Sequence, residues 1–333
     1  MPSKPERTRF VLSRVTMVVI GLACICAPSG VRAQVRPEMY PIETVTLSTQ
    51  QVLTGDKNGK SALLAGELRI PPATGRVPAV ILVHGSGGLG LSVERWAQEI
   101  NGIGVAAFLL DSFSGRGITS TVDDQSQLDS LAMMVDAYRA LGVLAKHSRI
   151  DANRIAIMGF SKGAVAAVYS SNERFRKLYA PVNARFAAHI GLYTPCNVAY
   201  HDDDKLTGAP LRLFHGIADD YVAIGPCRSY VDRLKKAGAD ITLTEYAGAH
   251  HAYDGSFRGT EPVALPQAVT TRNCELEEGE RGVILNSKTK KAYDANKDSC
   301  VERGTHVGYN EAATVATTQA VREFLASQFR LKP

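Results

Sequence analysis

The sequence predicts an α/β fold, in which a mostly parallel central sheet is flanked by helices on both faces. Apolar runs alternate with helical stretches along the chain, as in consecutive strand–helix–strand units. The run VPAVILVHG at 77–85 is almost continuously apolar, as expected of a strand buried on both faces. Polar residues follow several of these runs, at the carboxyl ends of strands, where open α/β sheets bind their ligands.

The expected elements follow from periodicity, turn residues and helix-end signals. The segment 44–70 is expected to form two strands around the polar turn TGDKNGK. The segment 123–146 is expected to be one long helix, because it begins with acidic residues and ends with Lys146 and His147, as the helix dipole favours. Further strands are expected at 77–85, 105–111, 154–160, 186–194, 210–216 and 240–248, and further helices at 94–103, 162–170, 225–237 and 314–329.

The first 33 residues are predicted to be a secretory signal peptide that is cleaved before Gln34. A basic segment precedes the apolar stretch from Val15 to Ala27, and Val31-Arg32-Ala33 ends in a small residue. Because the apolar stretch is shorter than the about 20 residues of a membrane span, cleavage is favoured over a retained membrane anchor. We therefore expect a single mature domain at 34–333, located in the periplasm or secreted.

The basic charge of the chain is concentrated in this leader. The formal net charge is +5, and residues 1–33 carry +4 of it, from Lys4, Arg7, Arg9, Arg14 and Arg32 against Glu6. The mature chain is therefore left with about +1, from the difference of these two values. We see no basic patch that indicates nucleic-acid binding.

The cysteines that remain after cleavage predict two disulfides. Their number is even, and an exported protein meets an oxidising compartment. Three pairings are possible. We favour the two pairs that each bracket one local segment, Cys196–Cys227 and Cys274–Cys300. The sequence has no C-x-x-C and no H-E-x-x-H motif, so we expect no metal site, and no organic cofactor is implied.

The segment 255–310 is expected to be irregular, because it is rich in Gly, Lys and Asp. It contains Cys274 and Cys300, which predict a disulfide-stapled loop around 270–305. Such a segment could cover a bound substrate or act as a rigid staple, and the sequence leaves both roles open.

The segment from Gly159 to Gly163 matches G-x-S-x-G between a predicted strand and a predicted helix. In this context the serine lies on a tight turn with its hydroxyl exposed above the sheet, and the glycines avoid clashes with neighbouring backbone. We therefore predict that Ser161 is a nucleophile. The helix that follows directs the backbone N–H of Lys162 toward developing negative charge. The side chain of Lys162 is expected to lie in solvent.

A serine nucleophile needs a general base and an acid that orients the base. His250 and His251 follow the last predicted strand, and Asp219 and Asp220 follow the strand at 210–216. The order serine, acid, histidine, each after its own strand, is the order of α/β hydrolases, so we predict that fold. The residues alone leave the choice within each pair open.

The oxyanion hole needs a second backbone donor from the loop after the AVILV run at 79–83. The HGSGG segment at 84–88 suits this role, because its glycines allow close approach of the backbone to substrate. We expect Ser86 to be the donor, with Gly87 as the alternative. His84 is expected to be structural.

Five segments resemble the dienelactone hydrolase family of α/β hydrolases. They are HGSGG, DSFSGRG (111–117), GFSKGA (159–164), HGIADDYV (215–222) and GAHHAYD (248–254). The likeness spans roughly 60–255 and the final helix.

This resemblance implies acyl-transfer chemistry, with Asp219 as the acid and His251 as the base. It also leaves Arg116 as either a substrate contact or a structural salt bridge. The enzymes that gave the family its name carry a cysteine nucleophile and are cytoplasmic, whereas this chain has Ser161 and a predicted export signal.

The sequence thus predicts an exported serine hydrolase that cleaves a carboxylic ester or lactone through an acyl-serine intermediate. A small-molecule ester or lactone is the expected partner, with no nucleic acid and no stable membrane anchor after cleavage. The alternatives are a peptidase or amidase, an acyltransferase on the same triad, or a non-catalytic binding protein on a hydrolase scaffold. The oligomeric state does not follow from the sequence.

Overall fold

The structure is a computed structural model that describes residues 1–2, 4, 37–255, 259, 261–295 and 297–331. The predicted signal peptide and its cleavage site lie outside these residues, apart from positions 1, 2 and 4. No helix of the described part is long and apolar enough to cross a membrane. Contacts within the chain group Val35–Pro333 into one unit.

An eight-stranded sheet forms the centre of this unit, in the order β1-β2-β4-β3-β5-β6-β8-β9. The pairs β1–β2 and β2–β4 are antiparallel, and every pair from β4 to β9 is parallel. The prediction of a mostly parallel central sheet is confirmed. The strands are β1 (Pro37–Thr46), β2 (Lys60–Arg69), β3 (Val77–Val83), β4 (Ala106–Asp111), β5 (Ile150–Phe160), β6 (His189–Leu192), β8 (Leu211–Gly216) and β9 (Ile241–Tyr246).

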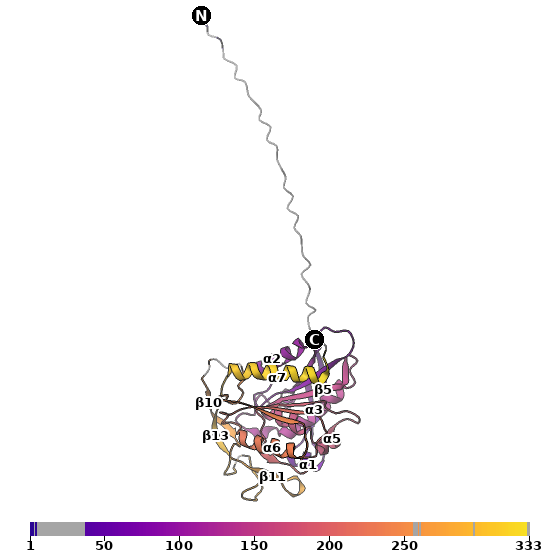
Figure 1. Cartoon of the computed structure of the whole chain (residues 1–333), viewed down its shortest axis with the longest axis vertical. Helices are drawn as coiled ribbons and strands as arrows, with labels where there is room; N and C mark the ends of the chain where they lie inside the picture. The colour runs from indigo at the N-terminus through magenta and orange to yellow at the C-terminus, as the bar shows by residue number, and fades with distance from the viewer. Residues whose placement is uncertain (3, 5–36, 256–258, 260, 296, 332–333) are drawn as a thin grey trace. The chain divides into compact units, whose positions relative to one another are not determined.

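Helices cover both faces of this sheet. Figure 1 shows α2 and α7 on one side of the strands and α6 on the other. The helices are α1 (Thr49–Thr54), α2 (Leu91–Gly102), α3 (Ser130–Leu144), α4 (Lys162–Tyr169), α5 (Glu173–Tyr179), α6 (Ile224–Lys236) and α7 (Glu311–Phe329).

Strand β3 shows why the run at 77–83 had to be apolar throughout. Ala79, Ile81 and Val83 pack into a core shared with α3, α4 and α6. Val80 and Leu82 point to the other face and pack into a second core with α2 and α7. Because side chains alternate along a strand, a strand between two helix layers has no polar position.

The helix expected at 123–146 begins only at Ser130, which corrects that prediction. The Asp124 side chain instead accepts the backbone N–H of Ser126 and caps a short 3₁₀ turn, Gln125–Gln127. Leu128 is then extended, with φ −154° and ψ 123°, so the chain cannot run on as one helix. The side-chain hydrogen bond of Asp124 thus stabilises a short turn where an α-helix was expected.

Helix α1 was not expected, because the segment between β1 and β2 was predicted to be a plain turn. Ser48 and Gln51 form a reciprocal capping box at its start, and Gly55 ends it in the left-handed conformation. This S-x-x-Q signal is readable in the sequence.

The segment 255–310 contains two small sheets where an irregular chain was expected. One is the antiparallel ribbon of β10 (Val263–Thr270) and β13 (Glu302–Val307). In the other, β11 (Leu276–Glu278) lies between β12 (Ile284–Asn286) and β7 (Val198–Ala199). The strands are short and partly exposed, so they lack the apolar alternation that identifies a strand in sequence.

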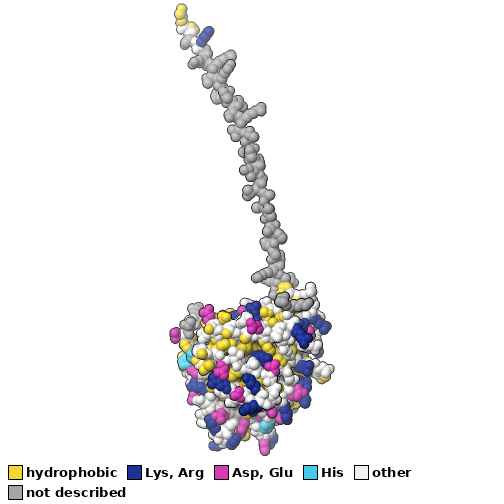
Figure 2. All heavy atoms as spheres, in the orientation of Figure 1, with side chains coloured by type: hydrophobic (Ala, Val, Ile, Leu, Met, Phe, Trp, Pro, Cys, Tyr) yellow, Lys and Arg dark blue, Asp and Glu magenta, His cyan; other side chains and the backbone are white. Residues whose placement is uncertain are grey.

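The surface mixes both signs of charge. Figure 2 shows Lys and Arg side chains interspersed with Asp and Glu over the visible face of the described residues. This pattern is consistent with the near-neutral balance calculated for residues 34–333.

One buried histidine makes the fold sensitive to acid. The Nδ1 of His189 in β6 donates to the carbonyl of Ala167 at 2.9 Å, and its Nε2 has no hydrogen-bond partner among the described residues. Burial lowers the pKa of His189 from 6.5 to about 4. As pH falls from 6.5 to 4 the unfolded chain takes up a proton that the folded chain does not, so stability is lost in this window.

We predict that His189 contributes a loss of about 3 kcal/mol in unfolding free energy between pH 6.5 and 4. Urea unfolding across this range measures it. The substitution His189→Gln should flatten the pH dependence, whereas the control His201→Gln, at a largely exposed histidine, should keep the wild-type slope. An unchanged slope in His189→Gln would contradict the prediction.

Candidate active site

Ser161 lies on the turn between β5 and α4, with φ 50° and ψ −117°. A side chain on Gly159 would clash with the carbonyl of Gly163, and one on Gly163 would clash with the carbonyl of Val83. Both glycines are therefore required for this turn to close against its neighbours. The G-x-S-x-G pattern thus forms the strand–turn–helix junction predicted for it.

Ser161, His251 and Asp219 form one hydrogen-bonded chain. The Nε2 of His251 is 2.9 Å from Ser161 Oγ, and its Nδ1 is 2.8 Å from Asp219 Oδ2. A proton on Nδ1 satisfies the carboxylate and leaves Nε2 free to accept the serine hydroxyl. The three residues follow β5, β9 and β8, so the parallel sheet brings them to one edge.

Asp219 is held as a buried carboxylate. Its Oδ1 accepts the backbone N–H groups of Tyr221 at 2.9 Å and Val222 at 2.8 Å. Burial alone raises the pKa of Asp219, but the charge of His251 and hydrogen bonds from His215 and His251 outweigh burial and hold the pKa well below its usual range. The group therefore stays ionised near neutral pH and accepts a hydrogen bond from the Nδ1–H of His251.

His215 is a neighbour of this carboxylate that sequence reasoning did not assign. Its Nε2 is 2.9 Å from the carbonyl of Val222 and 3.4 Å from Asp219 Oδ2. The His215 ring therefore contacts both the Asp219 carboxylate and the backbone of the loop that carries it. The signal was present, because His215 begins the HGIADDYV segment, one of the five on which the family resemblance rests.

The rival residue Asp220 is paired elsewhere, whereas the buried Nδ1 of His250 has no hydrogen-bond partner among the described residues. The Asp220 carboxylate accepts the backbone N–H of His306 at 2.9 Å and lies 2.7 Å from its Nδ1. The ring of His250 faces the His306 ring, with centroids 6.5 Å apart. His306 therefore pairs with the alternative acid, and its ring lies near that of the alternative base.

Ser86 and Lys162, the predicted oxyanion donors, lie on neighbouring loops beside Ser161. Val83 pairs with Gly159 across β3 and β5, so the loops after these two strands emerge side by side. Ser86 and Lys162 both line the cavity that contains Ser161, whereas Gly87 lies outside that lining. His84 is buried, its Nδ1 2.8 Å from the carbonyl of Gly85 and its Nε2 accepting the N–H of Ser112, which fits the expected structural role.

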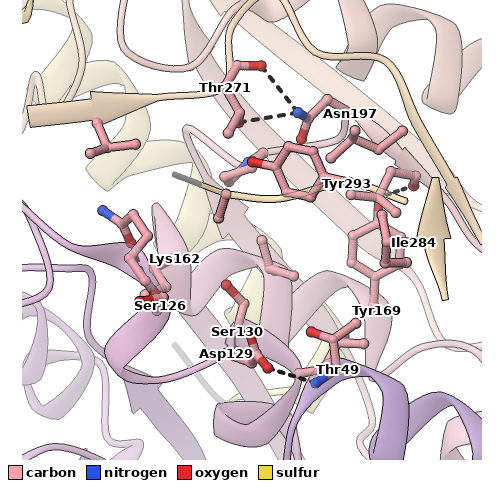
Figure 3. Close-up of a pocket in the computed structure, with 18 of the residues that line it drawn as sticks. Thr49, Ser126, Asp129, Ser130, Lys162, Tyr169, Asn197, Thr271, Ile284 and Tyr293 are labelled. Atoms are coloured by element: carbon pink, nitrogen blue, oxygen red, sulfur yellow. Dashed lines mark hydrogen bonds between the residues drawn. The ribbon is translucent and has the colours of Figure 1, made fainter. Parts of the chain in front are cut away.

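A cavity of about 480 Å³ opens beside Ser161. Helix α4 contributes Lys162 and Tyr169 to its wall, and the segment 255–310 contributes Thr271, Ile284 and Tyr293. Figure 3 shows Lys162 on one side of this cavity and Tyr293 and Ile284 on the other. The segment therefore forms part of the wall of the cavity, and its role as a substrate cover stays a prediction.

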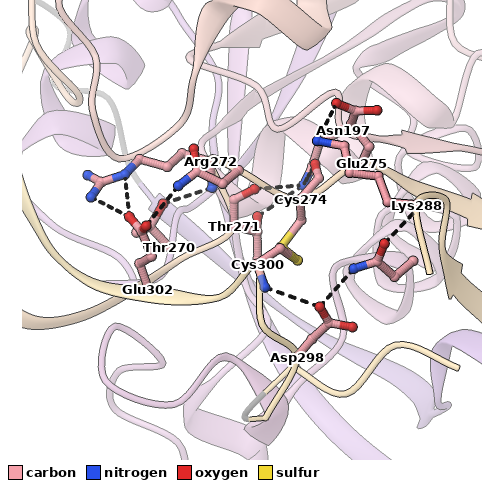
Figure 4. Close-up of a disulfide and its surroundings, with 12 residues drawn as sticks. Asn197, Thr270, Thr271, Arg272, Cys274, Glu275, Lys288, Asp298, Cys300 and Glu302 are labelled. Carbon is pink, nitrogen blue, oxygen red and sulfur yellow. Dashed lines mark hydrogen bonds and ion pairs between the residues drawn. A yellow bond between two sulfur atoms is a disulfide. The ribbon is translucent and has the colours of Figure 1, made fainter. Parts of the chain in front are cut away.

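The same segment is also firmly stapled. Cys274 and Cys300 are disulfide-bonded, as are Cys196 and Cys227. Figure 4 shows Arg272 paired with Glu302 beside the Cys274–Cys300 bond, with a shortest N–O distance of 2.6 Å. The wall is thus braced by a covalent bond and an ion pair at its base.

The ribbon of β10 and β13 also holds the loops that carry the acid and the base. Thr270 donates from its hydroxyl to the carbonyl of Tyr221 at 2.7 Å, and Arg272 donates to the carbonyl of Asp220 at 2.8 Å. The N–H of Gly308 donates to the carbonyl of His251 at 3.2 Å. One ribbon therefore fixes the spacing of the Asp219 and His251 loops.

Arg116 has a structural role, which corrects the alternative of a substrate contact. Its guanidinium forms two bonds to Asp136, at 2.7 and 2.9 Å, and both side chains are buried. It also donates to the carbonyl of Ser112 and to the hydroxyl of Thr46, each at 2.7 Å. These bonds use four of its five N–H donors, and the cavity wall does not include it.

The side chain of Lys162 is buried, which contradicts the expectation that it lies in solvent. It is 5% exposed, and its Nζ donates to the backbone and side-chain oxygens of Gln125 at 2.9 and 3.1 Å. Burial lowers the pKa of Lys162 to about 8, although Asp129 and Asp124 act in the opposite direction. The late start of α3 is what leaves Gln125 in a turn that reaches this lysine.

The described residues contain no cluster of side chains suited to binding a metal ion. No set of three or more His, Cys, Asp or Glu residues there could hold a metal ion.

Comparison with known proteins relates the chain to one family. The profile of the dienelactone hydrolase family matches residues 64–269. A Bradyrhizobium protein named "Probable 2-oxo-3-(5-oxofuran-2-ylidene)propanoate lactonase" is 25% identical over 242 residues, which cover 68% of this chain and 92% of the relative. The esterase YpfH of Escherichia coli is 28% identical over 142 residues, which cover 43% of this chain and 56% of the relative.

Solved structures share the fold. Esterase 2 of Thermogutta terrifontis, phosphoramylated by tabun, superposes with a TM-score of 0.56 at 16% identity, covering 89% of this chain and 96% of that one. A dienelactone hydrolase-like promiscuous phosphotriesterase, P91, from metagenomic libraries gives a TM-score of 0.54 at 15% identity, covering 87% and 99%. The predicted α/β-hydrolase fold is confirmed.

We predict that replacing both Cys274 and Cys300 with serine lowers the unfolding free energy by about 3 kcal/mol, because the unfolded chain regains the freedom of the closed loop. Urea unfolding of the oxidised protein measures this loss. Replacing Cys196 and Cys227 should give a similar loss, since the two loops have similar sequence separations, 31 and 26 residues. Unfolding midpoints equal to wild type would contradict the prediction.

Proposed function

Because the chain belongs to the dienelactone hydrolase family, we propose that it is an exported serine hydrolase that cleaves a carboxylic ester or a lactone through an acyl-serine intermediate. The observation that carries the proposal is the hydrogen-bonded chain from Ser161 through His251 to Asp219, beside a cavity of about 480 Å³. The lactonase and esterase named among the relatives support an ester or lactone as the substrate.

In the acylation step, Ser161 Oγ attacks the carbonyl carbon while His251 Nε2 accepts the hydroxyl proton. The imidazolium that forms is stabilised by the ionised carboxylate of Asp219. The carbonyl oxygen becomes an oxyanion, which the backbone N–H groups of Ser86 and Lys162 bind. Collapse of the tetrahedral intermediate breaks the ester bond, and the leaving alkoxide takes the proton from His251.

In the deacylation step, a water molecule takes the place of the leaving group. His251 Nε2 removes one of its protons, and the resulting hydroxide attacks the acyl carbon. The second tetrahedral intermediate then releases the acid and returns the proton to Ser161. In a lactone, the alcohol formed in the first step remains part of the acyl chain, so one product leaves.

The proposal of export rests on the leader and on the cysteines. The pairing of Cys196 with Cys227 and of Cys274 with Cys300 supports it, because disulfides persist mainly in oxidising compartments. We propose a periplasmic or secreted location on these grounds.

Ser161→Ala tests the proposed function directly. We expect kcat/KM for a short-chain nitrophenyl ester to fall by roughly 10⁴-fold or more, because the covalent intermediate cannot form. Ser148→Ala is a matched control, since Ser148 is an exposed serine outside the cavity lining, and it should stay within a few fold of wild type. Wild-type turnover by Ser161→Ala would refute the proposal.

Two substitutions distinguish the neighbouring acids. Asp219→Asn should lower kcat by roughly 10⁴-fold, because an amide no longer stabilises the imidazolium and favours the wrong tautomer of His251. Asp220→Asn should cost less than about tenfold, since its carboxylate contacts His306 instead. Equal losses in the two variants, measured with the same ester, would mean that the acid has been misassigned.

A further inference from the structure

Lys162 is a buried cation beside the nucleophile that takes part in none of the ion pairs found among the described residues. Its Nζ is held by the two oxygens of Gln125, at 2.9 and 3.1 Å. Burying an ammonium without a counter-ion destabilises the fold, and an apolar side chain at this position would avoid that penalty. The arrangement therefore calls for a functional reason.

Gln125 connects this cation to the other side of the site. Its Oε1 accepts the hydroxyl of Ser86 at 3.1 Å as well as the Lys162 ammonium. The N–H of Thr121 donates to the carbonyl of Ser86 at 2.8 Å, and its hydroxyl is 3.4 Å from the same Oε1. One amide oxygen thus joins the side chains of the two residues whose backbone N–H groups we assign to the oxyanion hole.

We propose that Lys162 and Gln125 form a clamp that sets the spacing of the two oxyanion donors, and that both are positioning residues. The proposal rests on the proposed function, because it concerns the same hole. The clamp holds the loop after β3 and the start of α4 at a fixed separation. Since an oxyanion exists only in the transition state and the intermediates, the clamp should act on kcat and leave KM almost unchanged.

The charge of Lys162 makes this clamp pH-dependent. The carboxylates of Asp129 and Asp124, at the starts of α3 and of the 3₁₀ turn, favour the charged form of Lys162 and so act to raise its pKa. The charge of Lys162 in turn acts to lower the pKa of His84. A charged donor binds an amide oxygen more strongly than a neutral one. Loss of the ammonium charge above pH 8 should therefore weaken the clamp and lower kcat.

The test compares Ser161-dependent hydrolysis of a neutral nitrophenyl ester as a function of pH in wild type and three variants. Lys162→Met removes the donors at similar length, and we expect kcat to fall by about 10- to 100-fold with KM within about threefold. The fall in kcat above pH 8 should vanish in this variant. Gln125→Met should resemble it, and the double variant should be no worse than either, because both residues belong to one unit.

Gln125→Glu is the conservative variant, which should retain the activity that Gln125→Met loses. It keeps the acceptor oxygen and adds a negative charge, so kcat should stay near wild type and the basic limb of the pH profile should move to higher pH. Lys57→Met, at an exposed lysine, is the matched control and should change neither quantity. If Lys162→Met does not fold, the two Gln125 variants still test the clamp. A clamp predicts a lower kcat in Gln125→Met and a near-wild-type kcat in Gln125→Glu.

Two outcomes overturn the clamp. One is a wild-type kcat and pH profile in Lys162→Met and Gln125→Met. The other is a rise in KM with an unchanged kcat for the same ester, which would make Lys162 a substrate contact. The titration midpoint of the Lys162 ammonium can be measured by NMR without any substrate. We expect it near pH 8 in wild type and at a higher pH in Gln125→Glu. It therefore separates failure of the clamp from failure of the proposed function.

Discussion

The strained turn at Ser161 is the constraint on which the rest of the site depends. A residue other than glycine at φ 50° and ψ −117° persists only where its surroundings determine it, at a cost of about 1–3 kcal/mol. Here every residue of α4 is buried, and the two flanking glycines let the turn close against β3 and α4 itself. The packing of α4 thus offsets the strain, fixes the serine hydroxyl above the sheet, and carries Lys162 into the interior.

A second layer of support comes from the segment between β9 and α7. Its ribbon and the residues next to it hold the loops of Asp219 and His251 by hydrogen bonds to backbone carbonyls, and its remaining strands close one wall of the cavity. One stapled insertion therefore links the geometry of the acid–base pair to the shape of the substrate space. Its rigidity is consistent with a site whose contacts are formed before substrate arrives.

Features encoded locally could be predicted from the sequence, and features that depend on distant contacts could not. The turn at Ser161 was readable because its glycines are adjacent to it. The preference for His251 over His250 rested on family resemblance. The preference for Asp219 over Asp220 did too, since the group that pairs with Asp220 is His306, far along the chain. The burial of Lys162 depends on Gln125, 37 residues earlier, in a segment that the sequence assigned to a helix.

The most direct test of the account is a crystal structure of the protein after reaction with a fluorophosphonate. We predict that phosphorus is bonded to Ser161 Oγ and that its phosphoryl oxygen lies about 3 Å from the backbone nitrogens of Ser86 and Lys162. His251 should lie between the adduct and Asp219. Phosphorus on another residue, or a phosphoryl oxygen that neither nitrogen contacts, would contradict the account.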